Sequence, residues 1–185
     1  MSNGQNRGYI QPTLASVPVE IDPFAPGTVI RYALAIEAAA NIFGGTAMVF
    51  FPSQVLSLMV TRTSFINPTT ESLVQWLGAL VYGLTVPVLL AIPNTRRGIE
   101  SRQTVYYTLL GGEGTLIPTF LWHMTRNSGF TYKSLVASAV VLAATCGWRL
   151  LALFKRPDWL GRYRDIKKEE FYGESQREST EALIR

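Results

Sequence analysis

Three ionisable side chains lie within long hydrophobic stretches of the chain: Glu37, Glu113 and Arg149. A charge at the centre of a bilayer costs at least about 2.5–3.5 kcal/mol, so a residue of this kind needs a structural or chemical reason to be there. A carboxyl group can hold or transfer a proton, and a guanidinium can neutralise a carboxylate. These three residues are therefore the first candidates for chemistry.

Glu37 and Arg149 are predicted to form a structural ion pair. Each lies five residues from the same-side end of its hydrophobic stretch, which is a depth of about 7–8 Å in a helix. Opposite charges at one depth relieve each other's desolvation, so we expect the two side chains to approach within about 5 Å. In the alternative, the long side chain of Arg149 reaches the lipid headgroups.

Glu113 lies nine residues from that same side of its stretch, and no cation is predicted at its depth. Asn41, nine residues into the first stretch, is a neutral polar candidate at the same level. Burial disfavours a lone carboxylate, so Glu113 is expected to be protonated. It is then either a polar tie between helices, for example to Asn41, or a proton donor in a lipophilic pocket.

His123, the only histidine, lies near the opposite end of the third stretch. Gln75, Trp76 and Trp122 are predicted at a similar level, where they could form one polar cluster with it. An imidazole there is either a solvated anchor or a proton-transfer group. The candidate catalytic set is Glu113, Glu37, Asn41 and His123.

No cofactor or metal is expected from the sequence. It lacks the HExxH, CxxC, nucleotide-binding glycine-rich and GxSxG motifs. With a single histidine and a single cysteine, Cys146, a metal site would consist mainly of carboxylates. The net charge of +4 does not indicate nucleic-acid binding, because the basic residues flank the hydrophobic stretches.

Four hydrophobic stretches must position these residues, at 32–51, 73–92, 104–124 and 135–154. Each has about the 20 residues that cross a bilayer as a helix, and helices satisfy their backbone groups internally in lipid. The predicted fold is therefore all-α. It is an integral, multi-pass membrane protein with a four-helix transmembrane bundle, and the predicted parts are a polar, flexible segment at 1–28, the bundle at 29–154 and a charged tail at 155–185.

The distribution of basic residues predicts the orientation. An even number of spans places both termini and the 93–103 loop on one side, where ten Lys and Arg residues lie near span ends, against three on the other side. This bias predicts that both termini are cytosolic, in the endoplasmic reticulum or mitochondrial inner membrane if the protein is eukaryotic. The ten are Arg31, Arg96, Arg97, Arg102, Lys155, Arg156, Arg162, Arg164, Lys167 and Lys168, and the three are Arg62, Arg126 and Lys133.

The connection at 52–72 is expected to be a capping loop, with a short interfacial helix over 55–60 as the alternative. Asn67-Pro68 predicts a turn before the second span. Small residues four apart predict close helix contacts in three spans. These strips are Ala40 and Gly44, then Ala79 and Gly83, and then Ala139, Ala143 and Gly147.

Two classes of function fit these features. The first is a non-catalytic accessory or scaffold component of a membrane assembly, whose partners are other membrane subunits or a second copy of the chain. The second is a cofactor-independent isomerase or cyclase that acts on a lipophilic polyketide or terpenoid, with Glu113 as general acid. A transporter is a third, weaker alternative. An enclosed pocket of about 300 Å³ or more lined by Glu113 would favour the enzyme.

The spacing of the four hydrophobic stretches resembles that of several small four-span families, including the DoxX-like proteins. The resemblance covers hydrophobic spacing alone. It therefore implies the four-span layout and transfers no site residues.

Overall fold

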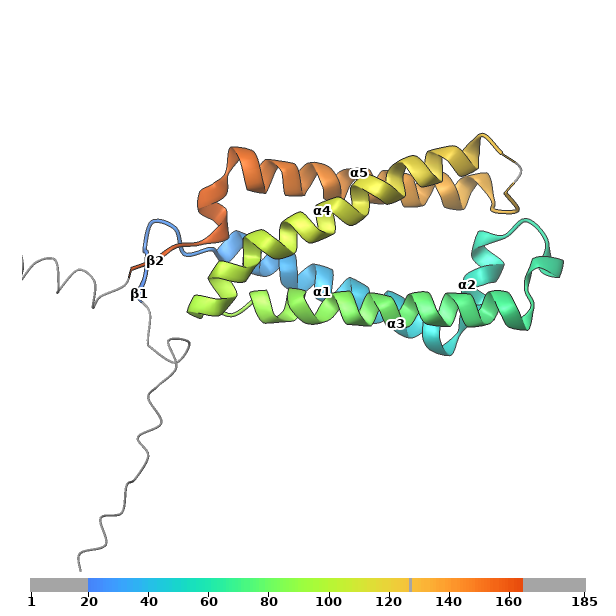
Figure 1. Cartoon of the computed structure of the whole chain (residues 1–185), viewed down its shortest axis with the longest axis horizontal. Coiled ribbons are helices and arrows are strands. Elements are labelled where there is room, and N and C mark those ends of the chain that lie inside the picture. Colours follow the sequence, from blue (N-terminus) through green and yellow to red (C-terminus); the bar gives the residue numbers. More distant parts are fainter. Residues whose placement is uncertain (1–19, 127, 165–185) are drawn as a thin grey trace, which may run out of the picture.

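The computed structural model describes residues 20–126 and 128–164, and this part of the chain is mostly helical (Figure 1). Residues 1–19 of the predicted N-terminal segment and residues 165–185 of the predicted tail lie outside the described residues. The elements in chain order are β1 (Glu20–Ile21), α1 (Thr28–Phe50), α2 (Pro52–Met59), η2 (Thr63–Phe65), α3 (Pro68–Ala91), α4 (Arg96–Met124), α5 (Tyr132–Leu150), η3 (Leu151–Lys155), η4 (Pro157–Leu160) and β2 (Tyr163–Arg164).

Within the described ranges, three helical segments are long and apolar enough to cross a membrane. They are Thr28–Phe50, Pro68–Ala91 and Tyr132–Lys155. The chain is therefore a helical membrane protein. At 29 residues α4 is the longest helix described, but its threonines, glycines and charged residues lower its hydropathy.

Two predictions about connections were wrong. The segment 93–103 is not a loop, because α4 begins at Arg96, where the Thr95 side chain caps the helix by accepting a hydrogen bond from the Gly98 amide at 3.1 Å. The connection after α1 also contains a helix, α2, instead of a simple capping loop. Pro52 starts this helix, in agreement with the preference of proline for the first helical turn.

The helices pack as two pairs (Figure 1). α1 runs along α3, and α4 runs along α5, while the start of α4 also contacts α3. α1 and α3 approach each other closely at Gly45 and Gly78, where a Cβ added to Gly78 would lie 2.8 Å from Met48 Cβ. The small-residue strips predicted for these two helices lie one or more positions from Gly45 and Gly78. A Cβ added to Gly44 or Gly83 would meet nothing within 4 Å, so these two predicted residues do not make the contact.

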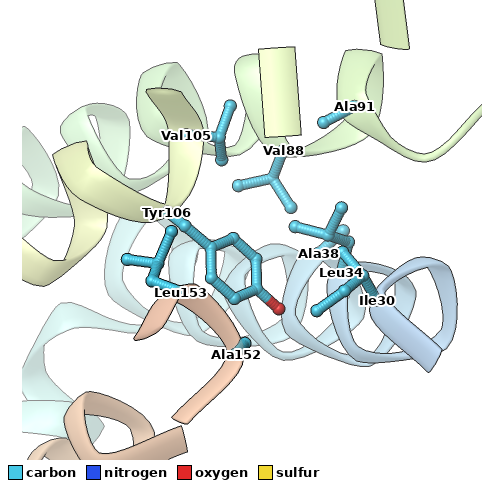
Figure 2. Packing of buried hydrophobic residues seen from close by; sticks show 9 residues of the cluster. All are labelled: Ile30, Leu34, Ala38, Val88, Ala91, Val105, Tyr106, Ala152 and Leu153. Atoms are coloured by element: carbon cyan, nitrogen blue, oxygen red, sulfur yellow. The ribbon is translucent and has the colours of Figure 1, made fainter. Parts of the chain in front are cut away.

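The hydrophobic core lies at the end of the molecule where α3 ends and α4 begins (Figure 2). The Tyr106 side chain is fully buried there among residues from α1, α3 and η3. The labelled members are Ile30, Leu34, Ala38, Val88, Ala91, Val105, Tyr106, Ala152 and Leu153. This core joins the two helix pairs firmly at one end.

Short backbone pairings close both ends of the molecule. At the core end, β1 pairs antiparallel with β2, so the two described ends of the chain meet. At the α2 end, Val60 and Phe130 form a β-bridge, and the Thr131 amide donates to the Met59 carbonyl at 2.7 Å. The segment after α2 is thereby tied to the start of α5.

Candidate functional site

Arg149 links three helices through two carboxylates beside the core residue Tyr106. Its Nε–H donates to both oxygens of Glu113 at 3.0 Å, and its Nη1 and Nη2 donate to Glu37 at 3.0 and 2.6 Å. Glu37 lies on α1, Glu113 on α4 and Arg149 on α5. We call these three residues the charged trio. The two residues paired by depth in the sequence, Glu37 and Arg149, are in direct contact.

The expectation that Glu113 has no cation at its depth was wrong. Glu113 forms an ion pair with Arg149, and no hydrogen bond joins it to Asn41 in the described structure. The physical reason is the length of the arginine side chain. The residue count gave the depth of each Cα atom in the membrane. The Arg149 guanidinium lies several bonds from its Cα, so it can reach carboxylates of residues at two different depths. Glu113 is therefore not the lone, unpaired carboxyl group that the sequence-based expectation assumed.

Two members of the charged trio are buried, and the third, Glu37, has a side chain that is 20% exposed. Arg149 is 4% exposed and Glu113 is 6% exposed, so the alternative in which Arg149 extends to the headgroups is excluded. The Arg149 guanidinium also lies over the Tyr106 ring, 5.4 Å from its centroid. The Trp148 indole donates to the Tyr106 hydroxyl at 3.2 Å. These contacts fix the position of Arg149 on the core side of the trio.

Two carboxylates and one guanidinium give the trio a net charge of −1 when all are ionised. Arg102 adds a positive charge on the same face of α4, eleven residues before Glu113 and about 16 Å away along the helix. Tyr106 lies between Arg102 and Glu113 along α4, and its ring packs against the Arg149 guanidinium.

Arg102 was predicted to lie in a loop and to mark the cytosolic side, but it is fully buried. Its guanidinium donates to the carbonyls of residues 91–93 at the end of α3, to Asn94 Oδ1 at 2.6 Å and to the Leu160 carbonyl at 2.8 Å. A cation is favourable at the C-terminus of a helix, where carbonyl groups lack partners. The sequence offers one signal for this role: Arg102 lies four residues before Tyr106, so the two side chains fall on the same face of a helix.

Two glycines make room for Arg102. Gly27 has φ +67° and Gly161 has φ +89°, which are conformations that favour glycine. A Cβ added at these positions would lie 2.3 and 2.7 Å from Arg102 Nη1. Arg102 therefore links the end of α3 to Leu160 at the end of η4, and it packs against Gly27 just before α1.

A cavity of about 490 Å³ lies between the two helix pairs, in the half of the molecule nearer α2. Its walls include Met48 of α1, Val81 of α3 and Leu116 of α4, together with the first half of α5. Leu116 lies three residues, or about one helical turn, beyond Glu113. Glu113 itself does not line this cavity.

The residues predicted to cluster at the outer end are not brought together. The His123 ring packs edge-on against Phe130, with centroids 6.0 Å apart, and lies ten residues, about 15 Å along α4, from Glu113. The Gln75 side chain donates to the Val49 carbonyl at 3.0 Å. Trp122 instead stacks under the Arg126 guanidinium at 4.2 Å. His123 therefore has no geometric link to the charged trio.

Within residues 20–126 and 128–164, no three His, Cys, Asp or Glu side chains gather in a way that could hold a metal ion. Comparison of the chain with protein-family models, curated proteins and solved structures gives no match. The charged trio and the cavity are therefore the features of the molecule that bear on its function.

Proposed function

We propose that this protein is a non-catalytic accessory or scaffold component of a membrane assembly. The observation that carries the proposal is that Arg149 occupies both intramembrane carboxylates. A general acid must hold a transferable proton within reach of its substrate. Glu113 instead has both oxygens on Arg149 Nε and lies outside the cavity walls. The ion pairs of the trio hold α1, α4 and α5 together.

The proposed topology has four spans, α1, α3, α4 and α5, with both termini in the cytosol or the equivalent compartment. Three of these are long and apolar enough by themselves. The length of α4, about 43 Å, and the pairing of its buried Glu113 with Arg149 support a fourth span. The pairing of β1 with β2 supports an even number of crossings, since it brings the two described chain ends together.

Open glycines on the helix surfaces support contact with other membrane helices. A Cβ added at Gly111, Gly112 or Gly114 of α4 would meet nothing within 4 Å, so three open glycines gather within about one helical turn of α4, whereas α5 has a single one, Gly147. Glycine lets a neighbouring helix approach closely, and close packing is what holds helices together in lipid. We therefore place the partner, another subunit or a second copy of the chain, on the glycine face of α4.

The second candidate is the cofactor-independent isomerase or cyclase. The observation that favours it is the apolar cavity that begins one helical turn from Glu113. In this alternative a lipophilic substrate enters the cavity, and Glu113 leaves Arg149 to transfer a proton. Glu37 would then keep Arg149 in place.

One experiment separates the two candidates. Tagged wild-type chain, Glu113→Gln, Gly112→Leu and the control Gly147→Leu are expressed at matched levels, and cross-linked assemblies and lipophilic metabolites are measured in the same cells. The scaffold proposal predicts that Gly112→Leu loses the assembly, while Gly147→Leu keeps it and Glu113→Gln leaves the metabolites unchanged. An intact assembly combined with loss of one metabolite in Glu113→Gln would establish the enzyme instead.

A further inference from the structure

The cavity between the helix pairs results from the way the pairs are joined. The core and the charged trio hold the pairs together at one end, and the Val60–Phe130 bridge ties the other end. Between these two points α4 leaves α3 and runs toward α5 (Figure 1), and the cavity of about 490 Å³ is lined by residues of both helix pairs.

The size of the cavity indicates a small molecule. Ligand pockets have volumes of about 300–1,000 Å³. A transmembrane helix is about 10–12 Å in diameter and about 30 Å long, so it occupies more than about 2,000 Å³ by the same dimensions. The cavity is therefore too small for a partner helix, whereas a lipid-sized molecule fits it, and it is open on one side, where Leu77, Leu116 and Val141 are exposed.

The walls of the cavity are almost wholly hydrophobic. Leu116 and Phe120 of α4 face Leu142 of α5 and Val81 of α3 across it, and no lining residue carries a charge. A carboxylate or phosphate would therefore find no cation in the cavity, which selects an uncharged ligand.

Ser138 is the single polar residue in the cavity wall. Thr46, Ser72 and Thr85 each donate their hydroxyl to the carbonyl four residues earlier, as is usual in apolar helices. The Ser138 hydroxyl has no hydrogen-bond partner in the described part of the chain, although it lies in a hydrophobic wall. A hydroxyl in such a setting gains from a partner that the ligand supplies.

We infer that this cavity binds a neutral lipophilic molecule of sterol-like size, with one hydroxyl or carbonyl group hydrogen-bonded to Ser138. The hydrocarbon body fills the space between the helix pairs, and the ligand enters sideways from the bilayer. This binding site is independent of whether the chain is a scaffold or an enzyme.

The test uses full-length protein in phosphatidylcholine nanodiscs with two photoreactive probes, a diazirine cholesterol and a diazirine palmitic acid. Cross-linked residues are mapped by mass spectrometry. Ser138→Ala removes only the hydroxyl, whereas Ser138→Leu also fills part of the cavity. Val140→Leu is the matched control, because Val140 is 62% exposed on the same helix and does not line the cavity.

The cholesterol probe is expected to label the cavity walls, with Leu116 and Phe120 among the labelled residues. Loss of one hydrogen bond should weaken competition by unlabelled cholesterol about two- to tenfold in Ser138→Ala. Labelling should fall more than tenfold in Ser138→Leu and stay unchanged in Val140→Leu. If Ser138→Leu fails to fold, Ala137→Leu fills the cavity from the adjacent position.

Three results would overturn the inference. Uniform labelling of cavity and outward-facing residues would mean that the cavity is ordinary lipid contact surface. Stronger cavity labelling by palmitic acid than by cholesterol would mean an acyl-chain groove. Sterol labelling that is equal in wild type, Ser138→Ala and Ser138→Leu would mean that Ser138 makes no contact with the ligand.

Discussion

Replacement of Arg149 by methionine is the sharpest perturbation of the fold. Arg149 is 4% exposed and donates to all four carboxylate oxygens of Glu37 and Glu113. Its removal leaves two carboxyl groups close together in an apolar interior. Breaking a buried ion pair from one side costs about 3–5 kcal/mol. The expected loss in the free energy of unfolding is of that size, a factor of about 100 to several thousand in the folding equilibrium.

The assay is reversible unfolding in mixed detergent micelles, followed by circular dichroism. Leu150→Met is the control, since it introduces the same side chain at a neighbouring, 43% exposed position. The triple variant Glu37→Gln, Glu113→Gln, Arg149→Met removes every charge of the trio and should recover most of the loss. A single Arg149→Met variant within about 1 kcal/mol of wild type would refute the reasoning. So would a triple variant as unstable as the single one.

Two further changes test the end of the molecule near Arg102. Gly27→Ala should destabilise the protein by about 1–3 kcal/mol, because its φ is +67° and the new Cβ would lie 2.3 Å from Arg102 Nη1. The control Gly44→Ala should leave the stability unchanged, because an added Cβ there meets nothing within 4 Å. Equal melting temperatures for the two variants would contradict this account. A hydrogen bond from Tyr163 lowers the pKa of Glu100 from 4.5, so this contact stabilises the fold above the ordinary carboxyl pKa and is lost as the pH falls through the lowered value. In Tyr163→Phe the pKa of Glu100, followed by ¹³C NMR, should rise back toward 4.5, and an unchanged pKa would contradict the assignment.

The helices were predictable because hydrophobic length and helix periodicity are local properties of the sequence. The approach of Glu37 to Arg149 was also predictable, since both are charged and lie at one depth. The second partner of Arg149 was not, because it depends on where the guanidinium extends from its Cα. Counting residues along a helix gives the position of a Cα atom, but it does not give the direction in which a long side chain extends from it.

The burial of Arg102 could not be predicted from the sequence for a related reason. A basic residue between two hydrophobic stretches is usually a solvated flank, and the orientation rule treats it so. Its role arises from the free carbonyls at the end of α3 and from Gly27 and Gly161, which are far from it in sequence. The cavity could not be predicted from the sequence either, because its size depends on the distance between the two helix pairs.

The charge state of Glu113 tests the central claim most directly. Infrared difference spectra of wild type and Glu113→Gln in lipid report whether a protonated carboxyl band is lost with this side chain. The ion lock with Arg149 predicts loss of a carboxylate band and no loss of a protonated carboxyl band. Loss of the protonated band would mean that Glu113 holds a proton beside the cavity, and it would contradict the account in favour of a general acid.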